Sequence, residues 1–391
     1  MPPWAEHAIF WHVYPLGFGA GRPRPLRHLA GWLDYAVELG CSAIMLGPVF
    51  ASETHGYDTV DHFAIDPRLG DERDFDHLVE QARDRGLRIV LDGVFNHVAR
   101  SFPAGEGWLR RRPGSGEYDT FEGHHHLVVL DHAEPAVREH VTAVMDHWLG
   151  RGAAGWRLDA AYAVPAGFWA QVLPGVRERH PDAWFSGEVI HGDYADYVER
   201  SGLDSVTQYE LWKAIWSSLN DRNLFELAWA LDRHNRMLET FTPQTFAGNH
   251  DVTRLATRLD DPRHLGHALA VLFTVGGLPS VYYGDEQAFQ GLKEEREGGD
   301  DAIRPAFPDT PAGLAPDGWP AYRTHQRLIG ARRRHKGAAT ARTTVEHLTG
   351  TAAVLRSGAG ITLLLNVGDE PHRFPGLGEV PPHAWEIIEE K

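Results

Sequence analysis

The chain has 391 residues, of which 42% are hydrophobic, and it carries a formal net charge of −16. This length suits one (β/α)8 barrel of roughly 250 residues with additional segments, and the apolar content excludes a disordered protein. The negative charge argues against nucleic acid or an anionic membrane as a partner.

Cys41 is the only cysteine, so an intrachain disulfide is excluded. The first residues, MPPWAEHAIFWHVYP, lack the charged and apolar regions of a signal peptide, and no stretch approaches the roughly 20 apolar residues of a membrane span. We therefore expect a cytoplasmic protein. The sequence does not specify its oligomeric state.

Short apolar runs alternate with amphipathic segments along most of the chain. Buried parallel strands read as nearly continuous apolar runs, as CSAIMLGPV and LRIVLDGVF do. Eight such runs are present, the number that a barrel needs. The predicted strands are Ile9–Pro15, Cys41–Val49, Leu87–Asn96, Gly155–Ala161, Trp184–Ile190, Ser205–Glu210, Gln244–Asp251 and Gly277–Asp285.

Helices are predicted between these strands. Val137, Val141, Val144 and Trp148 recur at helical spacing in PAVREHVTAVMDHWLG, and DFDHLVEQARDRG shows the same periodicity.

Two long segments lack the alternation of strands and helices, and the pattern changes again near the C-terminus. Residues 98–134 form an insertion after the third strand, and residues 287–320 follow the eighth. Short β-like runs begin near residue 338. We predict an α/β fold, a (β/α)8 TIM barrel over residues 1–337 with a short insertion at 98–134, and a small all-β domain over residues 338–391.

Four motifs at predicted strand ends carry the candidate chemistry. They are DGVFNH (92–97), GWRLDAA (155–161), GEV (187–189) and FAGNHD (246–251). The strand ends of a barrel share one face, so Asp159, Glu188 and Asp251 are expected to converge there. Several carboxylates are costly to hold together unless they do chemistry, which favours a glycosidase site.

Arg157 and Asp159 are two residues apart in a strand and therefore point to the same side. The Arg would keep the Asp ionised as a nucleophile, although a structural ion pair is the alternative. Glu188 has apolar neighbours, which favours the protonated form that a general acid needs. The separation that distinguishes retaining from inverting enzymes cannot be read from the sequence.

The four motifs, in this order, resemble the conserved regions of the α-amylase family, glycoside hydrolase family 13, from FWHVYPLGF to GGLPSVYYGDE. The resemblance implies a retaining hydrolase of α-glucans or α-gluco-oligosaccharides that acts through a covalent glucosyl-enzyme. It implies Asp159 as nucleophile, Glu188 as acid/base and Asp251 as the third carboxylate. The substrate-binding residues that it implies are Tyr57 (a stacking platform), Asp58, Asp92, His97, Arg157, His250 and Arg304, with Asp58 and Arg304 paired.

GEVIHGDYADYV and ALAVLFTVGGLPSVYYGDE look most like the neopullulanase, cyclomaltodextrinase and α-glucosidase groups. Those enzymes usually carry an additional N-terminal β domain and a longer insertion after the third strand. They also have Asn where this chain has Asp131, and often Trp where it has Ile190. The resemblance implies no required cofactor. Asn96 matches a position that can bind calcium.

Three alternatives remain at this stage. The same site could transfer a glucosyl group to a sugar acceptor, including isomerisation. A non-catalytic carbohydrate-binding barrel is disfavoured because all three carboxylates are present. A metal-dependent hydrolase is disfavoured because no HxH or HExxH-type pair at a strand end supports it, and His124, His125 and His126 fit a solvated loop better. Trp212 and Trp216 fit either outer sugar subsites or helix packing.

Overall fold

The computed structural model describes residues 1–296 and 298–390. Its main sheet has eight parallel strands in the order β10-β9-β8-β5-β2-β1-β12-β11. A parallel bridge between Thr207, next to β10, and Gln244 of β11 joins the two ends of that order. The predicted (β/α)8 barrel is confirmed. Its strands are β1 (Phe10–Val13), β2 (Ala43–Leu46), β5 (Arg88–Gly93), β8 (Gly155–Leu158), β9 (Trp184–Gly187), β10 (Ser205–Val206), β11 (Gln244–Phe246) and β12 (Leu278–Tyr282).

Each predicted strand contains one observed strand, but the observed strands are shorter at their carboxyl ends. The difference is largest at the seventh, where β11 already ends at Phe246. At the sixth, β10 has only two residues and helix α8 begins at Tyr209. Asp159, Glu188 and Asp251 therefore lie just beyond the ends of β8, β9 and β11, where the chain leads into the loops that follow these strands.

The chain divides into two compact units. Unit 1 comprises residues 1–3, 13–34 and 43–206, and unit 2 comprises residues 4–12, 35–42 and 207–391. The helices of unit 1 are α1 (Pro15–Phe18), α2 (Pro25–Ala30), α4 (Glu72–Asp84), α5 (Pro135–Gly150), α6 (Ala166–Arg179) and α7 (Tyr194–Ser201). Those of unit 2 are α8 (Tyr209–Asn220), α9 (Leu224–Met237), α10 (Leu255–Arg258), α11 (Leu265–Thr274) and α12 (Trp319–Arg334). The chain passes from one unit to the other within α3 (Leu33–Leu39).

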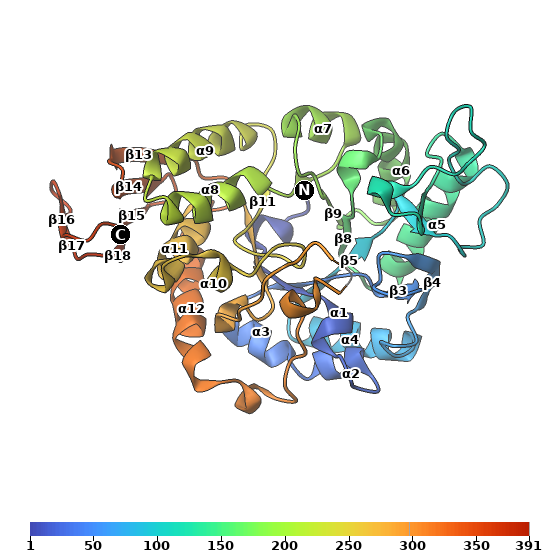
Figure 1. The fold of residues 1–391 in the computed structure, drawn as a ribbon, viewed down its shortest axis with the longest axis horizontal. Helices are drawn as coiled ribbons and strands as arrows, with labels where there is room; N and C mark the ends of the chain where they lie inside the picture. The colour runs from blue at the N-terminus through green and yellow to red at the C-terminus, as the bar shows by residue number, and fades with distance from the viewer. Residues whose placement is uncertain (297, 391) are drawn as a thin grey trace. The chain divides into compact units, whose positions relative to one another are not determined.

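The two helices predicted from periodicity are present. Helix α4 begins with a capping box between Asp71 and Asp74, which satisfies backbone N–H groups that the first turn leaves unpaired. Helix α5 buries Val137, Val141, Val144 and Trp148, as their spacing predicts. In unit 1, α5 packs beside α6, and in unit 2, α11 packs beside α12 (Figure 1).

The insertion after β5 is built on a small antiparallel hairpin. Its strands are β6 (His97–Ala99) and β7 (Leu127–Val129), with His97 opposite Val129. A second antiparallel pair in unit 1, β3 (Phe50–Ser52) and β4 (Thr59–Ile65), flanks the HGYD segment. These hairpins extend the loops that follow barrel strands, which are the segments where (β/α)8 proteins build their sites.

The C-terminal part is an antiparallel β domain, as expected. Its main sheet has the order β13-β14-β15-β18, and β16 and β17 form a separate hairpin. Their bounds are β13 (Thr343–Leu348), β14 (Ala352–Ser357), β15 (Ile361–Asn366), β16 (His372–Phe374), β17 (Gly378–Val380) and β18 (Ala384–Glu389). The boundary at residue 338 stays a prediction, and Lys391 lies outside the described residues.

Within the described part of the chain, no helix is both long and apolar enough to cross a membrane.

Gly155 begins β8, the strand that leads to Asp159, and it pairs with Trp184 of β9. A Cβ atom at Gly155 would lie 2.3 Å from the Trp184 carbonyl oxygen. Because this neighbour is backbone inside a ladder, it cannot move away cheaply, and the two strands must approach each other through glycine.

We expect Gly155→Ala to lower the free energy of unfolding by about 1–3 kcal/mol, since it overpacks a buried strand pair. Gly167→Ala in α6 is the control, because nothing lies within 4 Å of its added Cβ. This control should be neutral or slightly stabilising. Urea denaturation of both variants measures the difference, and equal stabilities would show that the close approach at Gly155 is not limiting.

Candidate active site

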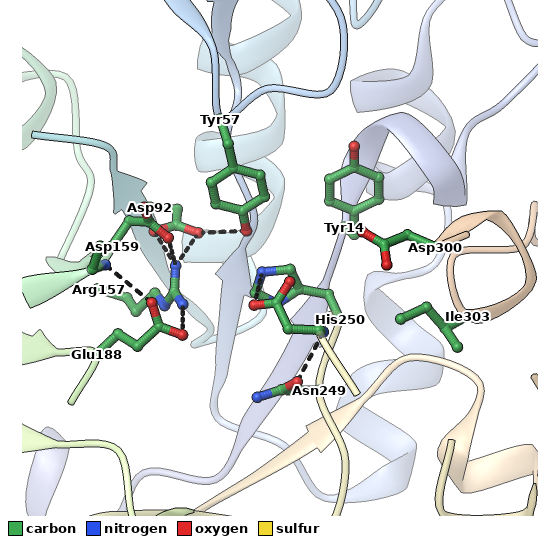
Figure 2. Close-up of polar contacts among 12 residues, drawn as sticks. Tyr14, Tyr57, Asp92, Arg157, Asp159, Glu188, Asn249, His250, Asp300 and Ile303 are labelled. Atoms are coloured by element: carbon green, nitrogen blue, oxygen red, sulfur yellow. Dashed lines mark hydrogen bonds and ion pairs between the residues drawn. The ribbon is translucent and has the colours of Figure 1, made fainter. Parts of the chain in front are cut away.

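One buried cation contacts three carboxylates in unit 1. Arg157 Nη1 lies 2.8 Å from both carboxylate oxygens of Asp92 and 2.9 Å from Asp159 Oδ1. Its Nη2 lies 2.8 Å from Glu188 Oε1. Figure 2 shows the Arg157 guanidinium among these three carboxylates, all of which are buried. The prediction that Arg157 and Asp159 share a face is confirmed.

Neighbouring strands bring these residues together. β5, β8 and β9 are adjacent and parallel, and Asp92 stands opposite Arg157 in the register. Backbone hydrogen bonds extend the ladders beyond the strand ends: Asp159 N donates to Gly93 O (3.0 Å), and Glu188 N donates to Leu158 O (2.8 Å). The two carboxylates therefore leave rigid strand ends, and little loop freedom remains to separate them.

Charge compensation explains why this cluster can be buried. Burial alone would lower the pKa of Arg157, but the surrounding Asp92, Glu188 and Asp159 raise it well above its usual value. Arg157 therefore stays charged at every relevant pH. An uncompensated buried carboxylate is costly, and one guanidinium with its fixed fork of donors serves three of them.

Tyr57 and Asp58, from the HGYD segment, lie near this cluster in unit 1. The Tyr57 hydroxyl donates to Asp92 Oδ2 (3.2 Å), which orients the ring, as Figure 2 shows. Asp58 is fully buried and accepts hydrogen bonds from Thr54 Oγ1 (2.5 Å) and His55 N (3.2 Å). These hydrogen bonds hold each of the two side chains in a single position.

His97 is a neutral ring in this part of the site. Burial lowers its pKa to about 3. The ring stacks on Phe121 of the insertion, with centroids 4.5 Å apart and planes 13° apart. Its Nδ1 lies 3.1 Å from Asn96 Nδ2. Asn96 Oδ1 is buried and has no hydrogen-bond partner among the described residues.

The sequence analysis missed a group of side chains around Tyr162, two of which come from the insertion. Tyr162 N donates to Glu188 O (3.1 Å), and the Tyr162 hydroxyl donates to Glu122 Oε1 (2.6 Å). Phe121 and His191 flank the Tyr162 ring, with centroids 6.5 Å and 5.6 Å away. Tyr162 could have been found from the sequence, because it lies only three residues after Asp159. Phe121 and Glu122 could not, because their contacts depend on how the insertion folds.

The predicted residues of unit 2 form a second polar cluster. His250 Nε2 lies 3.0 Å from Asp251 Oδ2, and Asp251 N donates to Asn249 Oδ1 (2.9 Å). Arg304 Nη2 lies 3.1 Å from Asp251 Oδ1 and 2.8 Å from Asp300 Oδ2. His250 and Asn249 are seen together in Figure 2. The Asp251 side chain is 33% exposed, so it can reach a ligand.

Arg304 also donates from Nε to the His250 carbonyl (3.1 Å). Besides its ion pair with Asp300, Arg304 thus contacts the loop after β11, which the sequence analysis did not foresee. The predicted pairing of Arg304 with Asp58 stays a prediction.

Two weaker sequence signals have structural explanations. His124, His125 and His126 are exposed, as expected of a solvated loop. Trp212 stacks on Phe246 of β11 with planes 21° apart, and the guanidinium of Arg258 lies over the Trp216 ring. Both tryptophans are half-buried packing residues of α8.

The family model described as the alpha amylase catalytic domain matches residues 13–108 and 104–310. A cyclomaltodextrinase from a Bacillus species is 31% identical over 340 residues, which are 74% of this chain and 61% of the relative. Neopullulanase 2 from Thermoactinomyces vulgaris is 30% identical over 344 residues, 75% of this chain and 58% of the relative. The chain thus spans about six tenths of the length of these relatives.

A solved structure similar in fold is the cyclic α-maltosyl-(1→6)-maltose hydrolase from Arthrobacter globiformis, in complex with cyclic α-maltosyl-(1→6)-maltose. It superposes with a TM-score of 0.88, at 23% identity, over 99% of both chains. The matched residues include both the barrel and the C-terminal β domain.

We expect Arg157→Met to lower the free energy of unfolding by about 3–5 kcal/mol at pH 7, because it leaves buried carboxylates without their cation. The loss should shrink towards pH 4. Uncompensated burial raises the pKa of the carboxyl groups in the folded state above their unfolded values. Protonation therefore removes the penalty at low pH, and the penalty grows as the pH rises.

Arg179→Met is the control, since Arg179 makes an ion pair with Asp146 whose side chains are 47% and 26% exposed. Arg179→Met should lower the free energy of unfolding by less than about 1 kcal/mol at both pH 7 and pH 4. Chemical denaturation at both pH values measures the effects. A loss for Arg157→Met that does not change with pH would contradict the electrostatic role.

Proposed function

Because the chain belongs to the alpha-amylase family, we propose that it is a retaining α-glycoside hydrolase acting on α-glucans or α-gluco-oligosaccharides. The contact of one Arg157 guanidinium with both Asp159 and Glu188 is the observation that supports this proposal most directly. Retaining enzymes use two carboxyl groups about 5–5.5 Å apart, and a shared cation is compatible with such a spacing.

Asp159 is the proposed nucleophile. Its Oδ1 faces Arg157, which favours the ionised carboxylate that attack requires. In the first step Asp159 attacks the anomeric carbon, and the bond from that carbon to the glycosidic oxygen breaks. Glu188 gives its proton to the departing oxygen. The product is a β-linked glucosyl-enzyme ester on Asp159.

Glu188 then acts as the base in the second step. It takes a proton from water, whose oxygen attacks the anomeric carbon while the ester bond to Asp159 breaks, so the sugar keeps its α configuration. When the ester forms, Asp159 loses its negative charge in the same step in which Glu188 gains one. The charge around Arg157 is thereby unchanged, so the buried cation remains compensated throughout the cycle.

The remaining polar residues are proposed to bind the sugar. Tyr57, whose hydroxyl is fixed by Asp92, presents a ring on which a glucose can stack. Neutral His97 can both donate and accept a hydrogen bond, as sugar hydroxyls require. Asp251 and His250 follow β11, whose carboxyl end is on the active face of a (β/α)8 barrel. Asp251 is the proposed third carboxylate. Asp58 and Arg304 are proposed to close the pocket.

Transfer to a sugar acceptor is the second candidate function, including isomerisation of the linkage. Phe121, Tyr162 and His191 place ring faces next to the Glu188 segment, and such surfaces can hold an acceptor sugar in place of water. A non-catalytic barrel is disfavoured because the chain keeps all three carboxylates, Asp159, Glu188 and Asp251. A metal-dependent hydrolase is disfavoured because, within the described residues, the group suited to a metal contains none of the strand-end residues.

The reaction requires no cofactor. Asn96 Oδ1 could bind calcium, since it is a buried oxygen with no hydrogen-bond partner among the described residues. It would supply only one of the six to eight oxygen ligands that calcium takes. A calcium ion bound there would hold the insertion in place. We propose a carbohydrate as the partner, with neither nucleic acid nor membrane, and a cytoplasmic location.

The test is product analysis with maltotriose, isomaltose, trehalose, sucrose, cyclodextrin, pullulan and starch. Asp159→Ala should lower turnover by roughly four orders of magnitude or more, because it removes the nucleophile. Asp232→Ala changes an exposed residue of α9 and should leave activity intact. Circular dichroism confirms that each variant is folded.

Monosaccharides and shorter oligosaccharides from the wild type alone would support hydrolysis at Asp159. Longer oligosaccharides would identify transfer. Activity of folded Asp159→Ala close to that of the wild type would contradict the assignment.

A further inference from the structure

A cluster of metal-ligating side chains lies outside the candidate active site, entirely within unit 2. His264 stands at the start of α11, His383 immediately precedes β18, and Asp261 precedes both on the segment after α10. The potential ligand atoms of these three residues lie within 4.8 Å of one another. None of them takes part in the proposed reaction.

The spacing of the ligand atoms suits a small tetrahedral ion. His264 Nε2 lies 3.0 Å from His383 Nδ1, and His383 Nδ1 lies 3.7 Å from Asp261 Oδ2. With zinc–ligand distances of about 2.0–2.1 Å, neighbouring ligand atoms in a tetrahedral site are about 3.3 Å apart. These two separations fall on either side of this value, and side-chain shifts that bring the remaining pair, now within 4.8 Å, closer together would complete the geometry.

A carboxylate behind His383 is an independent sign of a metal site. Asp369 Oδ1 lies 2.8 Å from His383 Nε2. Metal-binding histidines nearly always donate their second ring N–H to a carboxylate, a backbone carbonyl or water, which leaves the other nitrogen with a lone pair directed at the ion. Here that other nitrogen is Nδ1, the atom that faces His264 and Asp261.

The backbone and burial also favour a built site. His383 has φ = 50°, a left-handed conformation that is uncommon for a residue with a side chain and that aims its ring at His264. His264 is almost completely buried. Arg263 now binds Asp261, but its side chain is 58% exposed and can turn into solvent.

We propose that His264, His383 and Asp261 bind one Zn²⁺ ion, with water as the fourth ligand. Two imidazoles and one carboxylate are typical zinc ligands, whereas calcium and magnesium require more oxygens. The ion would connect the start of α11 to the turn before β18 and so clamp the C-terminal sheet onto the helix that precedes β12. Gly266 and Trp385 already make a close contact at this junction.

The chain contains a matched control for this cluster. His347 and His372, in the same C-terminal domain, also place ring nitrogens in contact, 2.9 Å apart. In the described part of the chain they belong to no group of three ligands. A histidine pair alone should not bind zinc tightly, so His372→Asn serves as the control for His383→Asn. Asn tolerates the left-handed backbone at position 383.

The experiment uses the full chain without a histidine tag, stripped with a chelator and titrated with Zn²⁺ by calorimetry. The wild type should bind one equivalent, and its Tm should rise with Zn²⁺. His383→Asn and Asp261→Asn should lose this site, and Asp369→Asn should bind about 10–100-fold more weakly. His372→Asn should bind like the wild type. Asp261→Asn keeps the side-chain oxygen that caps the Pro262–His264 turn.

A visible absorption spectrum of the Co²⁺-loaded protein provides a second readout, since four-coordinate Co²⁺ absorbs strongly. The Tm of each metal-free variant shows whether it is folded. The absence of stoichiometric Zn²⁺ binding, or equal binding by the wild type and His383→Asn, would overturn the proposal. Neither readout depends on glycosidase activity.

Discussion

The buried guanidinium of Arg157 is the interaction on which the site depends. Three carboxyl groups from the ends of β5, β8 and β9 lie side by side in a low-dielectric interior, and those that are ionised need a cation among them. Arg157 contacts Asp92, Asp159 and Glu188 with two nitrogens of one rigid fork. Its position in β8, opposite Asp92 of β5 and Ser186 of β9, ties the chemistry to the barrel itself.

The constraint also explains which residues surround the carboxylates. Gly155 allows β8 and β9 to approach, so that Asp159 and Glu188 leave neighbouring strand ends. The Tyr57 hydroxyl donates a hydrogen bond to Asp92, and this bond holds the Tyr57 ring in one orientation. The insertion then adds Phe121 against His97. Rigid strand ends carry the reacting groups, while loops carry the side chains that select a substrate.

Much of this could be predicted from local pattern. The period of two in GWRLD places Arg157 and Asp159 on one face, and the helical spacing of Val137, Val141, Val144 and Trp148 corresponds to α5. The contact between Arg157 and Glu188 could not be predicted, because it depends on the register between β8 and β9. Arg304 shows the same limit: its contacts with Asp251 and Asp300 follow from a loop conformation that no periodicity encodes.

The most direct test of the central claim is to trap the covalent intermediate and locate it. Glu188→Gln, incubated with an α-glucosyl fluoride, can still form the ester because fluoride leaves without an acid, but it lacks the base that hydrolyses the ester. Peptide mass spectrometry should then find one hexosyl group on Asp159. Labelling of another residue, or rapid turnover without a trapped ester, would contradict the assignment of Asp159 as nucleophile and Glu188 as acid/base.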